Sequence, residues 1–184
     1  GFGLIAVLAL AFTLRDLLPG GLAPGSLLAL LVGTLGMFLT GLADDIWHLG
    51  FKSRLLVQAA VALSMIFIGG VELASLGELL PGVQVELGWI GVPLTVFATI
   101  GLINAVNMID GIDGLSGAVS LVSLTFIAVV AHGGGNPACL VVALALMGGL
   151  AGFLFYNLRY PGNVRARVFL GDNGSMLLGF VFAW

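Results

Sequence analysis

The sequence predicts an all-α membrane protein, a polytopic bundle of transmembrane helices. Of its 184 residues, 60% are hydrophobic and only 8% are charged, whereas a soluble domain carries about 25% charged residues. The mean hydropathy is +1.19, and apolar runs follow one another with short polar segments between them. These runs do not alternate apolar and polar residues as the strands of an outer-membrane barrel do. We therefore expect one integral-membrane domain over residues 1–184.

About seven apolar segments predict whole or partial membrane helices. They cover residues 2–14, 26–42, 55–68, 89–108, 115–131, 139–156 and 176–184. The chain opens and closes inside an apolar run, and it starts with neither Met nor the basic region of a signal peptide. We therefore expect a piece of a longer protein whose first and last helices are truncated. The single cysteine, Cys139, excludes a disulfide within the chain.

The charges between these segments predict how the bundle crosses the membrane. The loops at residues 43–54, 104–114 and 157–175 hold five basic residues: Lys52, Arg54, Arg159, Arg165 and Arg167. The three loops of the other parity hold one, Arg15. Loops rich in Lys and Arg stay in the cytoplasm, so the first set is predicted to be cytoplasmic. On the opposite side, the alternation at residues 83–87 predicts a short strand.

Five carboxylates lie on the predicted cytoplasmic side, each at a helix end: Asp44, Asp45, Asp110, Asp113 and Asp172. Asp44 and Asp45 end one membrane helix. Two ionised acids at this depth repel each other and resist desolvation, so they need a cation or a hydrogen-bond donor. A solvated helix end is the simpler alternative for this pair.

A second group recurs every three residues at Asn104, Asn107, Asp110 and Asp113. In a regular helix the first and last of these side chains would face nearly opposite ways. Their oxygens converge only if the helix ends near Ile109 and the chain turns through Gly111 and Gly114, which allow such turns. The alternative is a plain helix end followed by Asp-Gly turns.

The third group, at residues 169–175, opens the last predicted helix with Asp172 and Ser175. Asp172 has the residue type of an N-cap. A helix N-terminus is also an anion site, where a carboxylate can share a metal ion with a bound phosphate. Lys52 and Arg54, beside the acid pair, are our first candidates for neutralising a diphosphate. Alternatively, the basic residues only fix topology or contact lipid headgroups.

The ligand types in these groups favour a hard cation. Mg²⁺ prefers one or two carboxylates plus substrate phosphates, and the sequence holds no Cys/His cluster for zinc. The residues therefore predict chemistry on a phosphate or diphosphate at the cytoplasmic face of a membrane, with a lipid as the acceptor.

Taken together, the three groups resemble the polyprenyl-phosphate N-acetylhexosamine-1-phosphate transferases, of the glycosyltransferase family 4 type. The resemblance covers essentially the whole chain. The segment 107–110 and the spacing from Asp45 to Lys52 and Arg54 are most similar to the undecaprenyl-phosphate GlcNAc-1-phosphate transferases of O-antigen, enterobacterial common antigen and teichoic acid synthesis. These enzymes serve lipopolysaccharide and cell-wall biogenesis. The phospho-MurNAc-pentapeptide translocase branch usually has Thr before the first Asp of the second motif, and it is the alternative.

The resemblance implies roles for individual residues. It makes Asn107 and Asp172 the magnesium ligands, with Mn²⁺ as the alternative ion, and it makes Asp44 and Asp45 the catalytic pair beside the lipid phosphate. It places the substrate-binding residues at Asn104, Asp110, Asp113, Lys52 and Arg54. It also implies a His-rich motif in a later cytoplasmic loop, which this chain does not reach.

The implied reaction is attack by undecaprenyl phosphate on the β-phosphorus of a UDP-N-acetylhexosamine, which releases UMP. The resemblance implies a multi-pass protein of the bacterial inner membrane with its site facing the cytoplasm, and no nucleic acid as a partner. A homodimer stays open, as does the role of the Asp pair as base or nucleophile. An ion-coupled transporter would place its acids near mid-membrane, and a prenyl-transfer enzyme would need a DDxxD pattern, which is missing after Asp45.

Overall fold

The computed structural model describes residues 23–80, 82–159, 161 and 165–184. The helix predicted at residues 2–14 and Arg15 lie outside these described residues. Over the described ranges the chain forms the following elements: α2 (Pro24–Trp47), α3 (Phe51–Phe67), β1 (Ser75–Leu80), β2 (Val83–Glu86), the 3-10 helix η2 (Gly88–Ile90), α4 (Gly91–Ile109), α5 (Leu115–Gly133), α6 (Pro137–Asn157) and α7 (Gly171–Ala183).

The helical fold class is confirmed. Each of the six predicted segments that fall on described residues is a helix. Four stretches are long and apolar enough to cross a membrane: Pro24–Trp47, Gly88–Ile109, Leu115–Gly133 and Pro137–Asn157. The chain is therefore a multi-pass membrane protein.

The two helix boundaries that differ most from the prediction, by five residues each, both concern carboxylates. α2 runs five residues past the predicted end, to Trp47, and stops where His48 takes a left-handed conformation with φ 51°. Asp44 and Asp45 therefore lie in the last helical turn and not in a loop. α7 begins at Gly171, so Asp172 lies in its first turn. The apolar runs underestimate both helices because polar residues continue each helix beyond the hydrophobic stretch.

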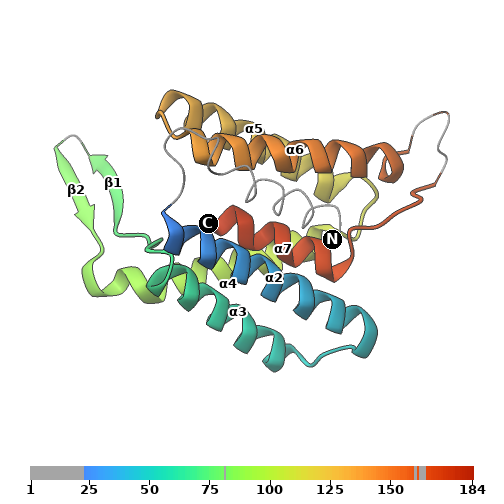
Figure 1. Cartoon of the computed structure of the whole chain (residues 1–184), viewed down its shortest axis with the longest axis horizontal. Helices are drawn as coiled ribbons and strands as arrows, with labels where there is room; N and C mark the ends of the chain where they lie inside the picture. Colours follow the sequence, from blue (N-terminus) through green and yellow to red (C-terminus); the bar gives the residue numbers. More distant parts are fainter. Residues whose placement is uncertain (1–22, 81, 160, 162–164) are drawn as a thin grey trace.

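The helices form two layers (Figure 1). α5 and α6 pack on each other in one layer, while α7 packs against α2 and α4 in the other, where α3 also contacts α2 and α4. Glycines allow the backbones to approach closely. A Cβ atom added to Gly179 of α7 would lie 2.5 Å from the Cα of Ile103 in α4, and one added to Gly41 of α2 would lie 2.4 Å from the backbone N of Asn173.

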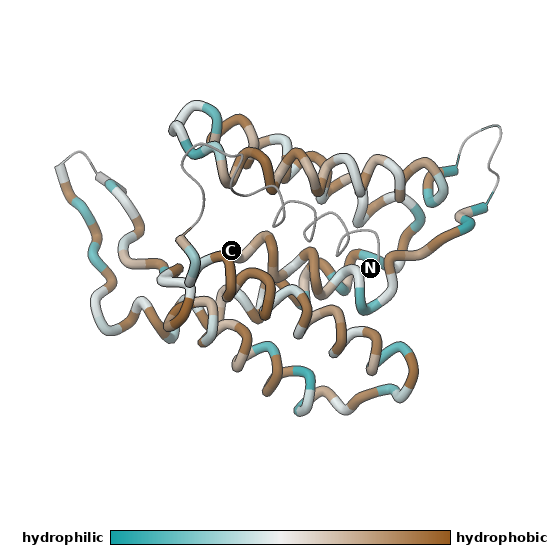
Figure 2. Tube along the Cα trace, in the orientation of Figure 1, coloured by the Kyte–Doolittle hydropathy of each residue, from teal (hydrophilic) through white to brown (hydrophobic). Residues whose placement is uncertain are grey.

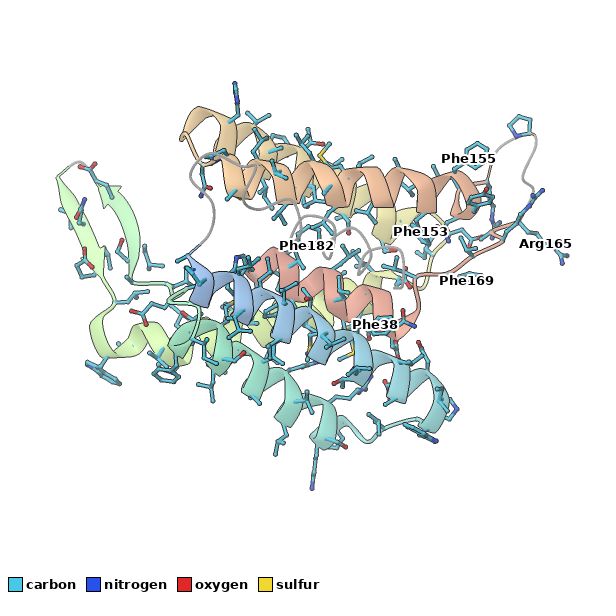
Figure 3. The ribbon with its side chains drawn as sticks, in the orientation of Figure 1. Phe38, Phe153, Phe155, Arg165, Phe169 and Phe182 are labelled. Atoms are coloured by element: carbon cyan, nitrogen blue, oxygen red, sulfur yellow. The ribbon has the colours of Figure 1, made fainter. Side chains whose placement is uncertain are left out.

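Two apolar clusters fill the interior. One joins α2, α3, α4 and α7 and includes Met37, Met65, Ile103 and Phe180. The other lies between the two layers, with buried leucines from α5, α6 and α7. Figure 3 shows Phe153 of α6 and Phe182 of α7 in this space, both packed against the second cluster.

The two ends of the bundle differ in structure. At one end, here called the hairpin end, β1 and β2 form an antiparallel pair between α3 and α4. β2 confirms the strand predicted at residues 83–87, whereas the sequence of β1 carries no alternation that would predict it. At the other end, here called the site end, α2, α4 and α6 finish and α3, α5 and α7 begin. Figure 2 shows hydrophilic residues collected at both ends and hydrophobic residues along the helices between them.

Candidate active site

Asp45 joins the end of α2 to the start of α7. Its carboxylate accepts hydrogen bonds from the backbone N–H of Asp172 at 3.1 Å and of Asn173 at 3.5 Å, and from the side-chain amide of Asn173 at 2.9 Å. The first N–H groups of a helix have no partner within the helix and carry a partial positive charge. The negative charge of the Asp45 carboxylate, at the end of α2, therefore stabilises the N-terminus of α7.

Asp44 has a different partner from its neighbour. Consecutive residues on an α-helix point about 100° apart, and Asp44 turns toward α3 instead of α7. Its Oδ2 accepts a hydrogen bond from Nη1 of Arg54 at 2.8 Å. The Asp44 side chain is 7% exposed and that of Arg54 is 30% exposed. The pair places a guanidinium, a group that matches phosphate oxygens well, beside the end of α2.

Asn107 and Asp172 are in direct contact. Nδ2 of Asn107 donates to Oδ1 of Asp172 at 2.6 Å and to Oγ of Ser175 at 2.8 Å. The N-cap of α7 is Leu170, which makes no side-chain cap, so Asp172 is not the N-cap residue. The interpretation of Asp172 as the N-cap of this helix is therefore wrong. Its carboxylate faces α4 instead.

The turn between α4 and α5 forms as the sequence predicts. α4 ends at Ile109, and Gly114 takes a left-handed conformation with φ 80°. Asp110 accepts hydrogen bonds from the hydroxyl of Ser116 and from the backbone N–H of Gly171. Burial raises the pKa of the Asp110 carboxyl above its ordinary value, and these two hydrogen bonds oppose that shift.

The four oxygen-bearing residues of this segment do not converge on one point. Asn104 faces α3, Asn107 faces α7, and Asp110 bonds within the turn and to Gly171. Asp113 pairs with Arg159 after α6, where Nη2 lies 2.6 Å from Oδ2. Among the described residues, no three His, Cys, Asp or Glu side chains gather where they could hold a metal ion. Asn107 and Asp110 therefore both contact the start of α7, whereas Asn104 contacts α3 and Asp113 contacts Arg159.

The remaining predicted residues lie at the site end without contacting the acid pair. Lys52 is exposed, and its ammonium lies 6.0 Å from the ring centroid of Phe51. Arg165 and Arg167 are exposed on the segment that leads to α7, where Figure 3 also shows Phe169. The backbone N–H of Arg167 donates to the carbonyl of Tyr156 at 2.9 Å.

Two buried amides at the site end were missed by sequence reasoning. Asn157, 3% exposed, accepts from the backbone N–H of Gly114 at 2.6 Å and donates to the carbonyl of Val168 at 2.8 Å. Gln58, 1% exposed, accepts from Asn104 at 2.8 Å. A signal for Gln58 was present, because it is the one amide in the apolar run at residues 55–68. Asn157 directly follows a predicted helix, and the sequence shows no feature that distinguishes it from an ordinary capping residue.

Comparison with known proteins places this chain in a family. The model of glycosyl transferase family 4 matches residues 27–184. A probable undecaprenyl-phosphate N-acetylglucosaminyl 1-phosphate transferase of Bacillus subtilis (strain 168) is 38% identical over 152 residues, which are 83% of this chain and 41% of that protein.

Two further relatives carry the name undecaprenyl-phosphate alpha-N-acetylglucosaminyl 1-phosphate transferase. The one from Haemophilus influenzae is 41% identical over 78% of this chain and 41% of its own length. The one from Escherichia coli K12 is 38% identical over 78% of this chain and 39% of its own length. The chain thus spans about two fifths of the length of these relatives. The match over residues 27–184 includes all three groups of polar residues, and the chain belongs to glycosyl transferase family 4.

Proposed function

We propose that the protein containing this chain transfers N-acetylglucosamine 1-phosphate from UDP-GlcNAc to undecaprenyl phosphate. A phosphate oxygen of the lipid attacks the β-phosphorus of the nucleotide sugar. The bond from that phosphorus to the bridging oxygen breaks, and UMP leaves with the electron pair. The product would feed the assembly of a cell-envelope polymer such as lipopolysaccharide or a cell-wall glycan.

The observation that carries the proposal is the meeting of three helix ends. Asp45 at the end of α2, Asn107 near the end of α4 and Asp172 at the start of α7 are joined by hydrogen bonds of 2.6–3.1 Å. Two arginines, Arg54 and Arg159, lie at the same end of the bundle through their ion pairs with Asp44 and Asp113. Carboxylates, an amide and guanidinium groups suit a diphosphate with its cation. The names of the relatives supply the sugar and the lipid for the proposal.

The donor set of Asn107 and Asp172 fits Mg²⁺, with Mn²⁺ as the alternative. One carboxylate and one amide oxygen leave most ligand positions to water and substrate phosphates, as Mg²⁺ prefers. The two side chains are within 2.6 Å of each other, and turning the Asn107 amide by 180° presents its oxygen beside Asp172. When bound, the ion would neutralise charge on the diphosphate.

Asp44 and Asp45 act in this proposal by orienting groups and not by taking an essential proton. A phosphate monoester has a second pKa of about 6, so the lipid phosphate is largely dianionic at neutral pH. Asp45 binds the N-terminus of α7, and Asp44 binds Arg54. Both carboxylates therefore hold in place the groups that would meet the two substrates. Asp110, Asp113, Lys52 and Arg54 are the proposed substrate-binding side chains. Asn104 is left out of this set because both hydrogens of its amide bond to protein oxygens, those of Gln58 and Ile100.

The experiment that tests this function follows the transferred sugar. Membranes holding the full-length protein are incubated with labelled UDP-GlcNAc, polyprenyl phosphate and Mg²⁺. We expect a labelled lipid and an equal amount of UMP, with less product from UDP-MurNAc-pentapeptide. Label that crosses the membrane without joining a lipid would instead support a transporter. Release of neither UMP nor labelled lipid would reject the transferase.

We also propose that the site end faces the cytoplasm of the inner membrane, on the basis of its basic residues. The test places one cysteine at each end of the bundle in a Cys139→Ser background. His48→Cys at the site end should react with an impermeant maleimide only after spheroplasts are opened. Glu86→Cys at the hairpin end should react in intact spheroplasts. The reverse pattern would contradict the orientation.

A further inference from the structure

Gln58 is a polar side chain in the interior of the layer formed by α2, α3, α4 and α7. It lies on α3 with 1% of its surface exposed. Its Oε1 accepts a hydrogen bond from Nδ2 of Asn104 on α4 at 2.8 Å. The same Nδ2 donates to the carbonyl of Ile100 at 2.8 Å. Both hydrogens of the Asn104 amide are therefore used, one within α4 and one across to α3.

This contact lies one helical turn from the candidate active site on both helices. Gln58 is four residues after Arg54, and side chains with this spacing share a helix face. Arg54 carries the guanidinium that binds Asp44. On α4, Asn104 precedes Asn107 by three residues, and Asn107 binds Asp172. The amide pair thus links the helix that presents Arg54 to the helix that presents Asn107.

The surrounding packing does not by itself fix how α3 is rotated against α4. Val61 and Met65 of α3 pack in an apolar cluster with Met37 and Ile103. Contacts of this kind have little directional preference, and in a membrane the lipid tails are equally apolar. A single buried amide contact can set the register between two helices because it is satisfied at only one alignment. Gln58 and Asn104 form such a contact.

We propose that Gln58 and Asn104 are positioning residues that set the rotation of α3, so that Arg54 faces the acid pair and the phosphate of the lipid acceptor. This inference rests on the proposed function. It gives Asn104 a role through Gln58 and Arg54, in place of direct contact with the substrate. Loss of the contact should therefore weaken acceptor binding and leave the nucleotide-sugar side of the site intact.

The test measures the KM for polyprenyl phosphate and for UDP-GlcNAc separately in full-length enzyme. Gln58→Leu and Asn104→Leu should each raise the KM for polyprenyl phosphate about three- to tenfold, the range expected for one interhelical hydrogen bond. The KM for UDP-GlcNAc and kcat should stay at the wild-type values. The double variant should be no worse than either single variant, because both remove the same contact.

An exchange variant supplies the rescue. Gln58→Asn combined with Asn104→Gln keeps two amides of the same total length across the helix pair, so the KM for polyprenyl phosphate should return to the wild-type value. Thr34→Val is the matched control, because Thr34 is 3% exposed and, within the part of the chain that the structure describes, its hydroxyl donates to carbonyls of its own helix. If Gln58→Leu does not accumulate in membranes, Gln58→Asn alone takes its place, since it also loses the contact.

The outcomes separate this inference from the proposed function. Equal increases in both KM values, additive effects in the double variant or failure of the exchange variant would overturn the positioning role while transfer by the wild type stands. Absence of transfer by the wild type would overturn the proposed function and this inference with it.

Discussion

The two ends of the bundle both carry acidic residues, yet they use them differently. At the hairpin end the hydrogen bonds of side chains are mostly local, such as that from Gly82 to the carboxylate of Glu78. At the site end the contacts join residues far apart in sequence, as between Asp45 and Asp172, 127 residues apart, or Asn107 and Asp172, 65 residues apart.

This difference indicates which carboxylates are held by the fold and which are solvated. Glu72, Glu78 and Glu86 are exposed on the hairpin side. Asp44 is buried, and Asp110, Asp113 and Asp172 are half-buried between helix ends. A substitution at the site end therefore disturbs more than one element, whereas one at the hairpin end should remain local.

The largest expected effect is that of Asp172→Asn. Because Asp172 is not the N-cap, the substitution should cost helix α7 at most about 1 kcal/mol of favourable charge interaction at its N-terminus. Loss of a metal ligand should lower turnover by a factor of about 10² to 10³. UMP release across a magnesium titration in full-length enzyme measures the effect. Wild-type activity of the variant at low magnesium would remove Asp172 from the ligand set.

A smaller effect is expected from Gly41→Ala, which tests whether activity depends on the close packing of α7 against α2. The new Cβ would lie 2.4 Å from the backbone N and Cα of Asn173. Backbone atoms cannot rotate away, and such overpacking costs about 1–3 kcal/mol. We expect the first turn of α7 to move from Asp45, with a lower Tm and roughly tenfold lower activity.

Gly152→Ala on α6 is the matched control for that variant. Among the described residues, no atom outside the local backbone of α6 lies within 4 Å of the position where its Cβ would stand, so both Tm and activity should remain at wild-type values. Equal losses in the two variants would mean that any added methyl group harms the bundle and that the contact at Gly41 is not special.

The smallest effect is expected at the hairpin end. Glu86 is exposed on β2, and surface substitutions of this kind usually change stability by less than about 0.5 kcal/mol. Glu86→Gln should therefore leave both KM values, kcat and Tm unchanged. A clear loss of activity would show that the hairpin contributes to the reaction, and the contrast between the two ends would need revision.

The sequence was sufficient to predict the helices, their alternation and the turn after Ile109, because hydropathy and glycine placement act locally. Helix ends were harder, since Asp44 and Asp172 are polar residues that belong to helices. The strand β1 was missed because its residues do not alternate and its partner lies beyond a turn.

Partners across elements could not be predicted from spacing. A spacing of three or four residues says which side chains share a face, but not which helix that face meets. Asp44 and Asp45 look equivalent as adjacent acids, yet Asp44 binds a side chain of α3 and Asp45 binds the N-terminus of α7. Likewise, the regular series from Asn104 to Asp113 suggested that all four side chains share one ligand. In the structure Asn107 and Asp110 contact the start of α7, while Asn104 and Asp113 contact α3 and Arg159.

The side chain of Asn157 acts as an additional peptide group. It accepts from the N–H of Gly114 and donates to the carbonyl of Val168, as one residue of a strand does with its neighbours. These two bonds tie the turn at residues 110–114 to residues 165–170 before α7 through contacts of the protein itself. The conformational entropy of these segments is lost on folding and not on binding. A ligand that contacts this turn and these residues therefore binds to segments that the fold already holds in place. An inhibitor designed to fit them would not lose affinity by having to order them.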